Sequence, residues 1–364
     1  MICLDARGRN PFAYTVIMTV MNILNNVSLA VHSTMGLGGV AAHLVEVAER
    51  MELLEALSWA QERKLPVMMI GSGSNIVWRD EGFPGLIIVN SFKRYEVFEE
   101  DAANTYLTVG AGENWDSVVE RAASAGLTGI EALSLIPGTA GATPVQNVGA
   151  YGQEIAQTLT TIEAFDAKTG DYVTLRADDC GFGYRTSRFK TTDRGRFYIT
   201  ALTLHLQKGN PAPPYYASVQ SYFEKHAITT VTPMVLREAV IAIRQSRLPD
   251  PAVVHNNGSF FANPVISASQ LEGLRGSYPD LPAWPLPDDT VKIPAAWLIE
   301  QVGFKDVHDT ETGMATWHAQ PLVLVNEHAK STADLLAFKQ KIVDAVVDKF
   351  GITLVQEPEL LPLA

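Results

Sequence analysis

The sequence predicts a globular protein of mixed helix and strand content that divides into two domains. Hydrophobic residues make up 47% of the 364 positions and charged residues 19%, a balance typical of chains that bury a core. Strand-like apolar runs predominate from residue 43 to about residue 206, and only two helices are expected among them. Prolines and glycines concentrate in residues 208–214, where we place the boundary between the domains.

The first domain is predicted to begin with a helix over residues 50–64, in which apolar residues recur near helical spacing. Pro66 ends this helix, and the apolar run at 67–70 (Val-Met-Met-Ile) predicts a buried strand. A second strand is predicted over residues 86–89, after a turn rich in glycine and proline. A further helix is expected over residues 115–125.

The second domain contains two well-marked helices. Residues 232–244 open with Thr-Pro, which predicts an N-cap followed by proline at the first helical position. Residues 331–350 open with Ser, carry Asp three residues later and are followed by Gly351, a typical helix stop. Residues 1–20 have no recognisable pattern, and we expect a disordered extension there.

Composition excludes several classes of function. The formal net charge of −12 argues against non-specific binding of nucleic acid. Cys3 and Cys180 belong to no CxxC pair or Cys/His cluster, so we expect neither a disulfide framework nor a metal site. The apolar stretch at 11–31 is interrupted by three asparagines, so we expect no membrane-spanning helix. An anionic ligand would have to be bound by locally placed Arg, Lys or backbone N–H groups.

The first candidate site is the loop at residues 71–75 (Gly-Ser-Gly-Ser-Asn), directly after a predicted buried strand. Glycines let backbone N–H groups approach a phosphate, and Ser and Asn add donors. A tight turn between strands is the alternative interpretation. The loop is not a GxGxxG fingerprint, and a strand follows it soon after, so a Rossmann domain is not expected.

The second candidate site is the uncharged run at residues 136–152, which is rich in glycine, proline and threonine. A long loop of this kind usually surrounds a ligand. Its small side chains leave backbone and hydroxyl donors accessible, which suits a flat, phosphorylated cofactor. The alternative is an elaborate loop that packs only on itself.

These two loops, with residues 109–112 (Val-Gly-Ala-Gly), resemble the FAD-binding half of the MurB family. Three further motifs follow in the order of that family, and each is weak when taken alone. They are residues 182–187 (Phe-Gly-Tyr-Arg-Thr-Ser), 258–264 (Gly-Ser-Phe-Phe-Ala-Asn-Pro) and 357–359 (Glu-Pro-Glu). The ordered set is specific, and the resemblance spans residues 33–359.

The resemblance implies an α+β fold: an FAD-binding domain of the vanillyl-alcohol-oxidase (PCMH) type, followed by a smaller α+β substrate-binding domain. We assign residues 21–208 to the first domain, with two subdomains split near residue 90. Residues 209–364 form the second, and their C-terminal segment is expected to return to the active site. The FAD is expected to be non-covalent, because no His or Cys lies at a recognisable attachment position. The residues that match cofactor contacts are Gly71, Ser72, Gly73, Ser74, Asn75, Pro137, Gly138, Thr139, Gly141, Thr143, Asn147, Gly149 and Arg244.

The reaction implied is the NADPH-dependent reduction, through FAD, of UDP-N-acetylglucosamine enolpyruvyl ether to UDP-N-acetylmuramate, for peptidoglycan synthesis. Hydride addition to the vinyl carbon leaves negative charge that flows into the substrate carboxylate. Arg185 and a protonated Glu359 match the positions that stabilise this charge, and Ser259 matches the general acid. Without the resemblance, these residues would be interpreted as a surface arginine, a turn serine and a solvated carboxylate.

Five residues match substrate contacts of the family: Tyr184, Tyr216, Arg247, Asn263 and Gln320. Tyr216 lies in a tyrosine-bearing loop that resembles the lid of the longer subtype, and an apolar plug between domains is the alternative. Arg247 lies where a basic residue meets the UDP diphosphate.

The chain departs from the family pattern near its predicted ligands. Ala262 replaces a lysine that is common between Phe-Phe and Asn-Pro, and Leu361 lies where an arginine often follows Glu359. Each departure removes a positive charge.

Two other functions stay open: another FAD-dependent oxidoreductase of the same superfamily that acts on an alcohol or sugar, and a catalytically silent flavin- or nucleotide-sugar-binding protein. An assay of NADPH oxidation distinguishes them. We expect a cytoplasmic protein that binds neither nucleic acid nor membrane. A monomer is expected, with an oligomer left open.

Overall fold

The computed structural model describes residues 21–363, so the predicted extension over residues 1–20 lies outside the described residues. The chain begins with a four-stranded sheet in the order β1-β2-β5-β3, in which β1 is antiparallel to β2, and β2 and β3 run parallel to β5. Its strands are β1 (Leu24–Ser28), β2 (Val40–Val47), β3 (Val67–Ile70) and β5 (Phe83–Asn90). Both predicted strands of this region are confirmed, since 67–70 is β3 and 86–89 lies within β5.

Helix α1 (Arg50–Glu62) covers one face of this sheet. It buries Leu53, Ala56 and Ala60 in a core shared with β2 and β5. The helix begins where the sequence predicts and ends two residues early. The reason is local, because Lys64 has φ 55° and therefore cannot continue a right-handed helix. A short 3₁₀ helix, η1 (Leu29–His32), links β1 to the loop before β2.

A second sheet, antiparallel throughout, has the order β12-β11-β13-β7-β6, with β8 also paired to β13. Its strands are β6 (Tyr95–Glu99), β7 (Asn104–Gly110), β8 (Leu127–Thr128), β11 (Leu159–Asp166), β12 (Asp171–Arg176) and β13 (Phe197–Lys208). Helix α2 (Trp115–Ser124) packs against this sheet, and the side chain of Asn114 caps its N-terminus. A 3₁₀ helix, η5 (Ala177–Cys180), follows β12.

The long glycine-rich segment between β8 and β11 is ordered by short elements. These are the 3₁₀ helices η2 (Glu131–Leu133), η3 (Ala140–Ala142) and η4 (Ile155–Gln157), and the hairpin of β9 (Gly149–Ala150) with β10 (Gln153–Glu154). The indole of Trp115 donates to the carbonyl of Leu133, which ties the start of the segment to α2. The segment is therefore ordered and held in place against α2.

Beyond the predicted domain boundary, the chain first returns to the N-terminal half. Helices α3 (Ala217–Lys225) and α4 (Pro233–Gln245) lie above α2 and η2, and their apolar faces share a core with Ala132. Arg237 of α4 is almost fully buried and pairs with Asp116 of α2. The N-cap of α4 is the one predicted, since the hydroxyl of Thr232 accepts a hydrogen bond from the N–H of Val235 at 3.2 Å.

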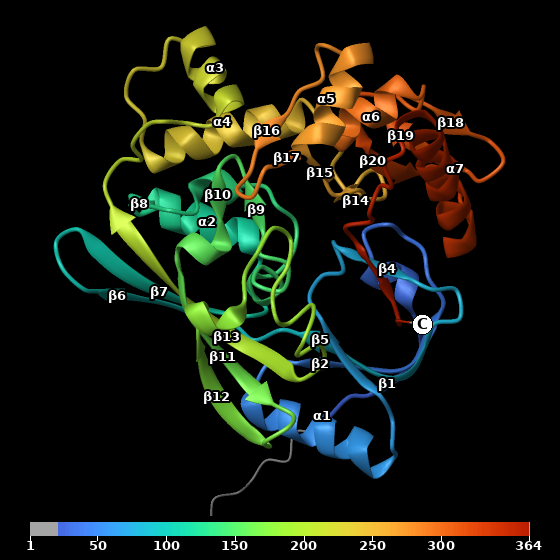
Figure 1. Ribbon diagram of the computed structural model, residues 1–364. Coiled ribbons are helices and arrows are strands. Elements are labelled where there is room, and N and C mark those ends of the chain that lie inside the picture. The colour runs from blue at the N-terminus through green and yellow to red at the C-terminus, as the bar shows by residue number, and fades with distance from the viewer. Residues whose placement is uncertain (1–20, 364) are drawn as a thin grey trace, which may run out of the picture.

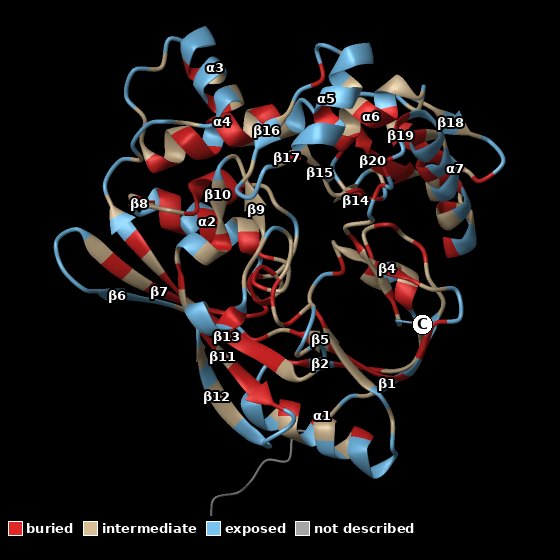
Figure 2. Cartoon of the chain, viewed as in Figure 1, coloured by how far each residue is buried: buried red, intermediate tan, exposed pale blue. Residues whose placement is uncertain are grey.

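The rest of the chain forms another core around two small sheets, to which Met35, Leu37 and Val77 of the first half also contribute. One sheet has the order β14-β20-β19-β18 and the other β15-β17-β16. Their strands are β14 (Asn256–Ser259), β15 (Val265–Ser267), β16 (Trp284–Pro285), β17 (Thr290–Lys292), β18 (His308–Asp309), β19 (Met314–Trp317) and β20 (Gln320–Asn326). They pack with α5 (Ala268–Ser277), α6 (Ala295–Gln301) and α7 (Thr332–Phe350). Figure 2 shows that the outward faces of α3, α5 and α7 are exposed.

The last strand leaves this core and joins the first half of the chain. β21 (Glu359–Leu361) pairs in parallel with β4 (Ile76–Trp78), a strand directly after the loop at 71–75. Figure 1 shows β21, in red, running down to β4 beside the C-terminus. The predicted α+β class is confirmed. Within residues 21–363, no helix is both long and apolar enough to cross a bilayer.

Candidate active site

Two predicted ligand-binding loops face each other across a cavity of about 310 Å³. One is the loop at 71–75 after β3, and the other is the segment at 136–143 around η3. Ten of the predicted cofactor residues line the cavity: Gly71, Ser72, Gly73, Ser74, Asn75, Pro137, Gly138, Thr139, Gly141 and Thr143. Glu359 and Leu361 of β21 also line it, so the C-terminal segment forms part of its wall.

Glycine is required in the first loop because other chain segments approach it closely. A Cβ on Gly73, which has φ +73°, would lie 2.0 Å from the carbonyl oxygen of His32. A Cβ on Gly71 would lie 2.3 Å from the hydroxyl oxygen of Thr139 on the opposite loop. The hydroxyl of Ser74 donates to the carbonyl of Pro137 at 3.0 Å and links the two loops directly. The loops are therefore fixed relative to one another.

The cavity has the donors and walls that a dinucleotide flavin needs. The backbone N–H groups of residues 72–75 donate to no other group in the part of the chain that the structure describes. Successive free N–H groups of this kind suit a diphosphate. Lys190 and Arg194 add positive charge to the lining, and β3 and Tyr198 supply apolar wall. Burial raises the pKa of Tyr198 to about 12, so its phenol is neutral near pH 7. The residues present fit FAD.

Two other predicted cofactor residues support the neighbouring loop rather than line the cavity. The buried Asn147 donates to the carboxylate of Glu154 at 2.8 Å and to the carbonyl of Gly183 at 3.1 Å. The carbonyl of Gly149 accepts a hydrogen bond from Arg185 at 2.7 Å. A Cβ on Gly149 would lie 2.7 Å from Cγ of Glu154, so this position also requires glycine. Both residues hold the turn that carries Arg185.

Arg185 lies at the tip of that turn with the left-handed backbone angle φ 55°, which non-glycine residues rarely adopt. Its Nε is 3.1 Å from Oε1 of Glu357, an ion pair that is mostly buried. Burial raises the pKa of Glu357, and the charge of Arg185 opposes that rise. Backbone strain at a residue whose side chain is held by two partners is typical of a functional position. The arrangement leaves the guanidinium of Arg185 in one fixed orientation.

The C-terminal segment connects the three predicted catalytic positions. The N–H of Glu357 donates to the carbonyl of Phe260 at 2.9 Å, directly after Ser259. Two residues later, the N–H of Glu359 donates to the carbonyl of Asn75 at 2.9 Å. Glu357 also pairs with Arg185. One short segment thus lies between the Ser259 strand, the Arg185 turn and the cofactor loop.

The strand of Ser259 is tied to the cofactor loop a second time through Asn257. The amide of Asn257 donates to the hydroxyl of Thr34 at 3.0 Å and to the carbonyl of Ser74 at 3.1 Å. The amide is buried, and it fixes β14 of the second domain against the loop of the first. Ser259 itself is half-buried. Its place therefore depends in part on the contacts of Asn257 with Thr34 and Ser74.

Glu359 has partners that the sequence does not indicate. Arg194 contacts both of its oxygens, with Nη1 2.9 Å from Oε2 and Nη2 3.3 Å from Oε1. Lys190 lies 3.9 Å from Oε1. Both cations come from the loop before β13, in a run of ordinary charged residues. The sequence marks the motif at 357–359 and the missing cation at Leu361, but it gives no sign of Lys190 or Arg194 as partners of Glu359. Glu357 was part of a motif, but no role was predicted for it.

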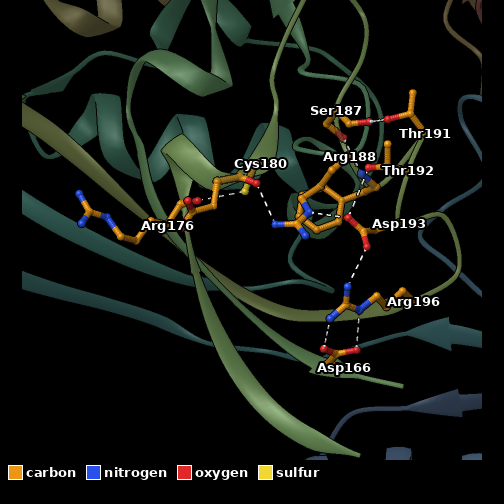
Figure 3. Close-up of polar contacts among 11 residues, drawn as sticks. Asp166, Arg176, Cys180, Ser187, Arg188, Thr191, Thr192, Asp193 and Arg196 are labelled. Carbon is orange, nitrogen blue, oxygen red and sulfur yellow. Dashed lines mark hydrogen bonds and ion pairs between the residues drawn. The ribbon is translucent and has the colours of Figure 1, made fainter. Parts of the chain in front are cut away.

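A network of ion pairs holds the loop that carries these cations. Figure 3 shows Arg188 and Arg196 directed at Asp193, and Arg196 also directed at Asp166. Nε of Arg188 is 2.8 Å from Asp193, and Nη1 of Arg196 is 2.9 Å from it. Arg196 binds both oxygens of Asp166, at 2.9 and 2.7 Å. The hydrogen bonds from Arg196 lower the pKa of Asp166 to about 2, so the pair stays charged at neutral pH.

The predicted substrate residues fall into two groups. Around the C-terminal end of α4, the ring of Tyr216 meets that of Tyr151 edge-on at 5.6 Å, and Arg244 and Arg247 lie beside Tyr151. Arg244 is half-buried and does not line the cavity, and its buried Nε has no hydrogen-bond partner among the described residues. This arrangement suits an anionic ligand that would complete the arginine's hydrogen bonding.

The second group lies near Arg185. Tyr184 lies close to Asn263, whose Oδ1 accepts a hydrogen bond from the N–H of Ala295 at 3.0 Å. Arg185 lies 5.2 Å from the centre of the Tyr184 ring. Gln320 begins β20, and no described contact joins it to either group. Among residues 21–363, no group of three or more His, Cys, Asp or Glu side chains is arranged to hold a metal ion.

Comparison with known proteins identifies the family. The profile described as an FAD binding domain matches residues 41–176, and that of the C-terminal domain of UDP-N-acetylenolpyruvoylglucosamine reductase matches residues 250–361. The reductase of Chromobacterium violaceum is 38% identical over 338 residues, which cover 92% of this chain and 98% of that protein. The reductase of Alcanivorax borkumensis is 39% identical over 333 residues, covering 91% and 94%. This chain belongs to the UDP-N-acetylenolpyruvoylglucosamine reductase family.

A solved structure of the same reductase family has the same fold. The enzyme of Thermus caldophilus superposes with a TM-score of 0.66 at 24% sequence identity, covering 94% of this chain and all of that one. The predicted FAD-binding domain is confirmed by the profile match, which spans parts of both N-terminal sheets. Residues 209–249, with α3 and α4, lie between the two matched regions, and the predicted boundary near 208 stays a prediction.

Proposed function

We propose that this member of the reductase family reduces UDP-N-acetylglucosamine enolpyruvyl ether to UDP-N-acetylmuramate, with NADPH as reductant and FAD as cofactor, in peptidoglycan precursor synthesis. The observation that carries the proposal is the junction at the C-terminal segment. There, residues 357–359 bond to Phe260, pair with Arg185 and reach the cofactor loop at Asn75. A substrate bound between the domains would contact all three predicted catalytic positions.

The residues around the cavity indicate which region of its wall would bind each part of FAD. The free N–H groups of residues 72–75 would hold the FAD diphosphate, and the apolar wall at β3 would accept a ring. The described lining contains no His or Cys, in keeping with a non-covalent flavin. When bound, FAD takes electrons from NADPH and supplies hydride to the vinyl carbon of the substrate.

Residues of the protein would then stabilise the developing negative charge and supply a proton. Arg185, fixed by Gly149 and Glu357, would place its guanidinium against the substrate carboxylate, where negative charge develops. Ser259 would hold a hydroxyl proton for the carbon next to that carboxylate. Glu359 is predicted to donate a hydrogen bond to the same charge. In the described geometry both of its oxygens accept from Arg194, so donation requires Glu359 to take up a proton and one of these contacts to break.

The substrate residues support binding of the nucleotide diphosphate. Arg247 and the half-buried Arg244 lie beside Tyr151, which contacts Tyr216, so positive charge lies near the predicted lid. Both co-reactants are highly charged nucleotides that do not cross a bilayer, and we place the reaction in the cytoplasm. We propose that the enzyme acts as a monomer, a point that light scattering at working concentration tests.

One anaerobic titration tests the function. The purified protein should be yellow, lose its absorbance with NADPH, and regain it on addition of the enolpyruvyl nucleotide with formation of UDP-N-acetylmuramate. Reoxidation by oxygen together with turnover of a simple alcohol or sugar would instead indicate an oxidase of the same superfamily. Precipitation with acid should release the flavin into solution, and flavin that stays with the precipitate would contradict non-covalent binding.

A further inference from the structure

The carboxylate of Glu359 is held in the cavity wall by contacts from two directions. Its backbone is fixed by the pairing of β21 with β4 and by the hydrogen bond to Asn75. Its side chain is fixed by Arg194, whose two terminal nitrogens reach the two oxygens at 2.9 and 3.3 Å. Planar, two-point contacts of this kind determine the orientation of a carboxylate as well as its position.

Among residues 21–363, Arg194 has no closer acidic partner that could draw it away. Its neighbour Asp193 is already occupied by Arg188 at 2.8 Å and by Arg196 at 2.9 Å. Nη2 of Arg194 also donates to the carbonyl of Lys190, which fixes the guanidinium from its own loop. The network in Figure 3 therefore anchors the loop and leaves the charge of Arg194 directed at Glu359.

The ion pair between Arg194 and Glu359 lies where its loss would affect a bound ligand. Both side chains line the cavity, and they are 34% and 18% exposed, so water screens them less than a surface pair. No positive charge is available from β21 itself. Leu361 is buried against Trp78 and Ile87 in the core around β4. The cation for Glu359 thus comes from a residue 165 positions away along the chain.

We propose that Arg194 is a positioning residue that orients Glu359 for the substrate half-reaction. This inference rests on the proposed function, in which Glu359 acts on the charge that develops in the substrate. Arg194 supplies the positive charge that the leucine at position 361 lacks. It holds the Glu359 carboxylate at the wall while the flavin is reduced, and one oxygen must leave it when substrate binds. Arg194 therefore acts through Glu359, and reoxidation by substrate should depend on it more strongly than reduction of the flavin by NADPH.

The test compares Arg194→Gln, Arg194→Lys, Glu359→Gln and the double variant of Arg194→Gln with Glu359→Gln in stopped-flow measurements of the holoenzyme. Because Arg194 also lines the cofactor cavity, the variants are compared after saturation with FAD, and Arg194→Gln should bleach with NADPH within about twofold of the wild-type rate. Its reoxidation at saturating enolpyruvyl nucleotide should be slower by about 10- to 100-fold, the effect of a misplaced catalytic group. Arg194→Lys keeps the charge and should recover most of that loss. In the Glu359→Gln background, loss of Arg194 should slow reoxidation by less than about twofold further, because coupled residues are not additive.

Arg50→Gln provides a matched control, since Arg50 pairs with Glu163 at 2.6 Å outside the cavity lining. It should reoxidise at the wild-type rate, and all variants should melt close to the wild type because partly exposed pairs contribute little to stability. Wild-type reoxidation in Arg194→Gln, or losses that multiply in the double variant, would overturn the inference. If Glu359→Gln is slow while Arg194→Gln is normal, only the inference fails. If Glu359→Ala, which removes the hydrogen-bond donor that glutamine would keep, is also normal, the proposed role of Glu359 fails with it.

Discussion

Replacement of Ser259 by alanine tests whether the hydroxyl of this residue has a catalytic or a structural role. Ser259 ends β14 and is half-buried, and its hydroxyl has no hydrogen-bond partner among the described residues. The strand is held through backbone pairing with β20 and through Asn257, which the substitution leaves in place. We therefore expect the free energy of unfolding to change by less than about 0.5 kcal/mol, as at other sites without a special contact.

The kinetic effect should be far larger than the effect on stability. A general acid usually contributes about 10²–10⁴-fold to the rate. That range corresponds to about 2.7–5.4 kcal/mol of activation free energy. Reduction of the flavin by NADPH does not need this proton. The loss should therefore appear only when the substrate reoxidises the enzyme, and NADPH-driven bleaching should keep its rate.

Stopped-flow absorbance of the flavin measures the two half-reactions separately in one preparation. Ser269→Ala is a suitable control, because Ser269 lies on the exposed start of α5 and outside the cavity lining. If Ser259→Ala were reoxidised by substrate at the wild-type rate, Ser259 would not be the proton donor. If it melted far below the wild type, the hydroxyl would have a structural partner that the described contacts do not include.

Three further substitutions test other parts of the site. Tyr216→Phe should weaken nucleotide binding by about 0.5–2 kcal/mol, the scale of one hydrogen bond, with unchanged melting because Tyr216 is 50% exposed. Gly73→Ala should lose flavin and at least about 1 kcal/mol of stability, because its Cβ would lie 2.0 Å from a backbone carbonyl. Arg237→Met should cost about 3 kcal/mol, the low end for a broken buried pair, because Asp116 remains 27% exposed. Stability of the wild type should also fall on acidification, since Asp116 must then be protonated.

The sign of that pH dependence follows from the contacts of Asp116. Burial raises the pKa of Asp116, but the hydrogen bonds from Arg237 and Leu135 and the charge of Arg237 outweigh burial and hold the pKa below its ordinary value. The stabilisation is therefore complete above about pH 4, the usual pKa of an unfolded aspartate, and is lost as the pH falls through the folded pKa. Chemical denaturation at several pH values measures it, and Arg237→Met should show a flatter profile.

Controls and contrary outcomes differ among these variants. Gly170 has φ +80°, but the space where a Cβ would lie is open. Gly170→Ala therefore carries the same backbone strain without the close contact and should keep its flavin. Equal loss in both glycine variants would mean that strain alone explains the effect. A Tyr216→Phe protein that binds nucleotide normally but melts lower would favour an apolar plug over a lid. Unchanged stability in Arg237→Met would show that α4 does not depend on the pair with Asp116.

Local sequence determines much of this protein because its cues act over a few residues. The start of α4 at Thr232, the stop of α7 at Gly351 and the loop at 71–75 each depend on capping chemistry or backbone freedom that neighbouring residues supply. Ordered motifs indicated the family and the predicted catalytic residues. Tertiary structure alone decides which partners these residues have. Glu359 meets Arg194, Arg185 meets Glu357, and α4 packs on α2, because folding brings together side chains that are far apart along the chain. An arginine in a charged loop has the same local surroundings whether it faces water or a carboxylate in the cavity, so only the folded chain distinguishes the two.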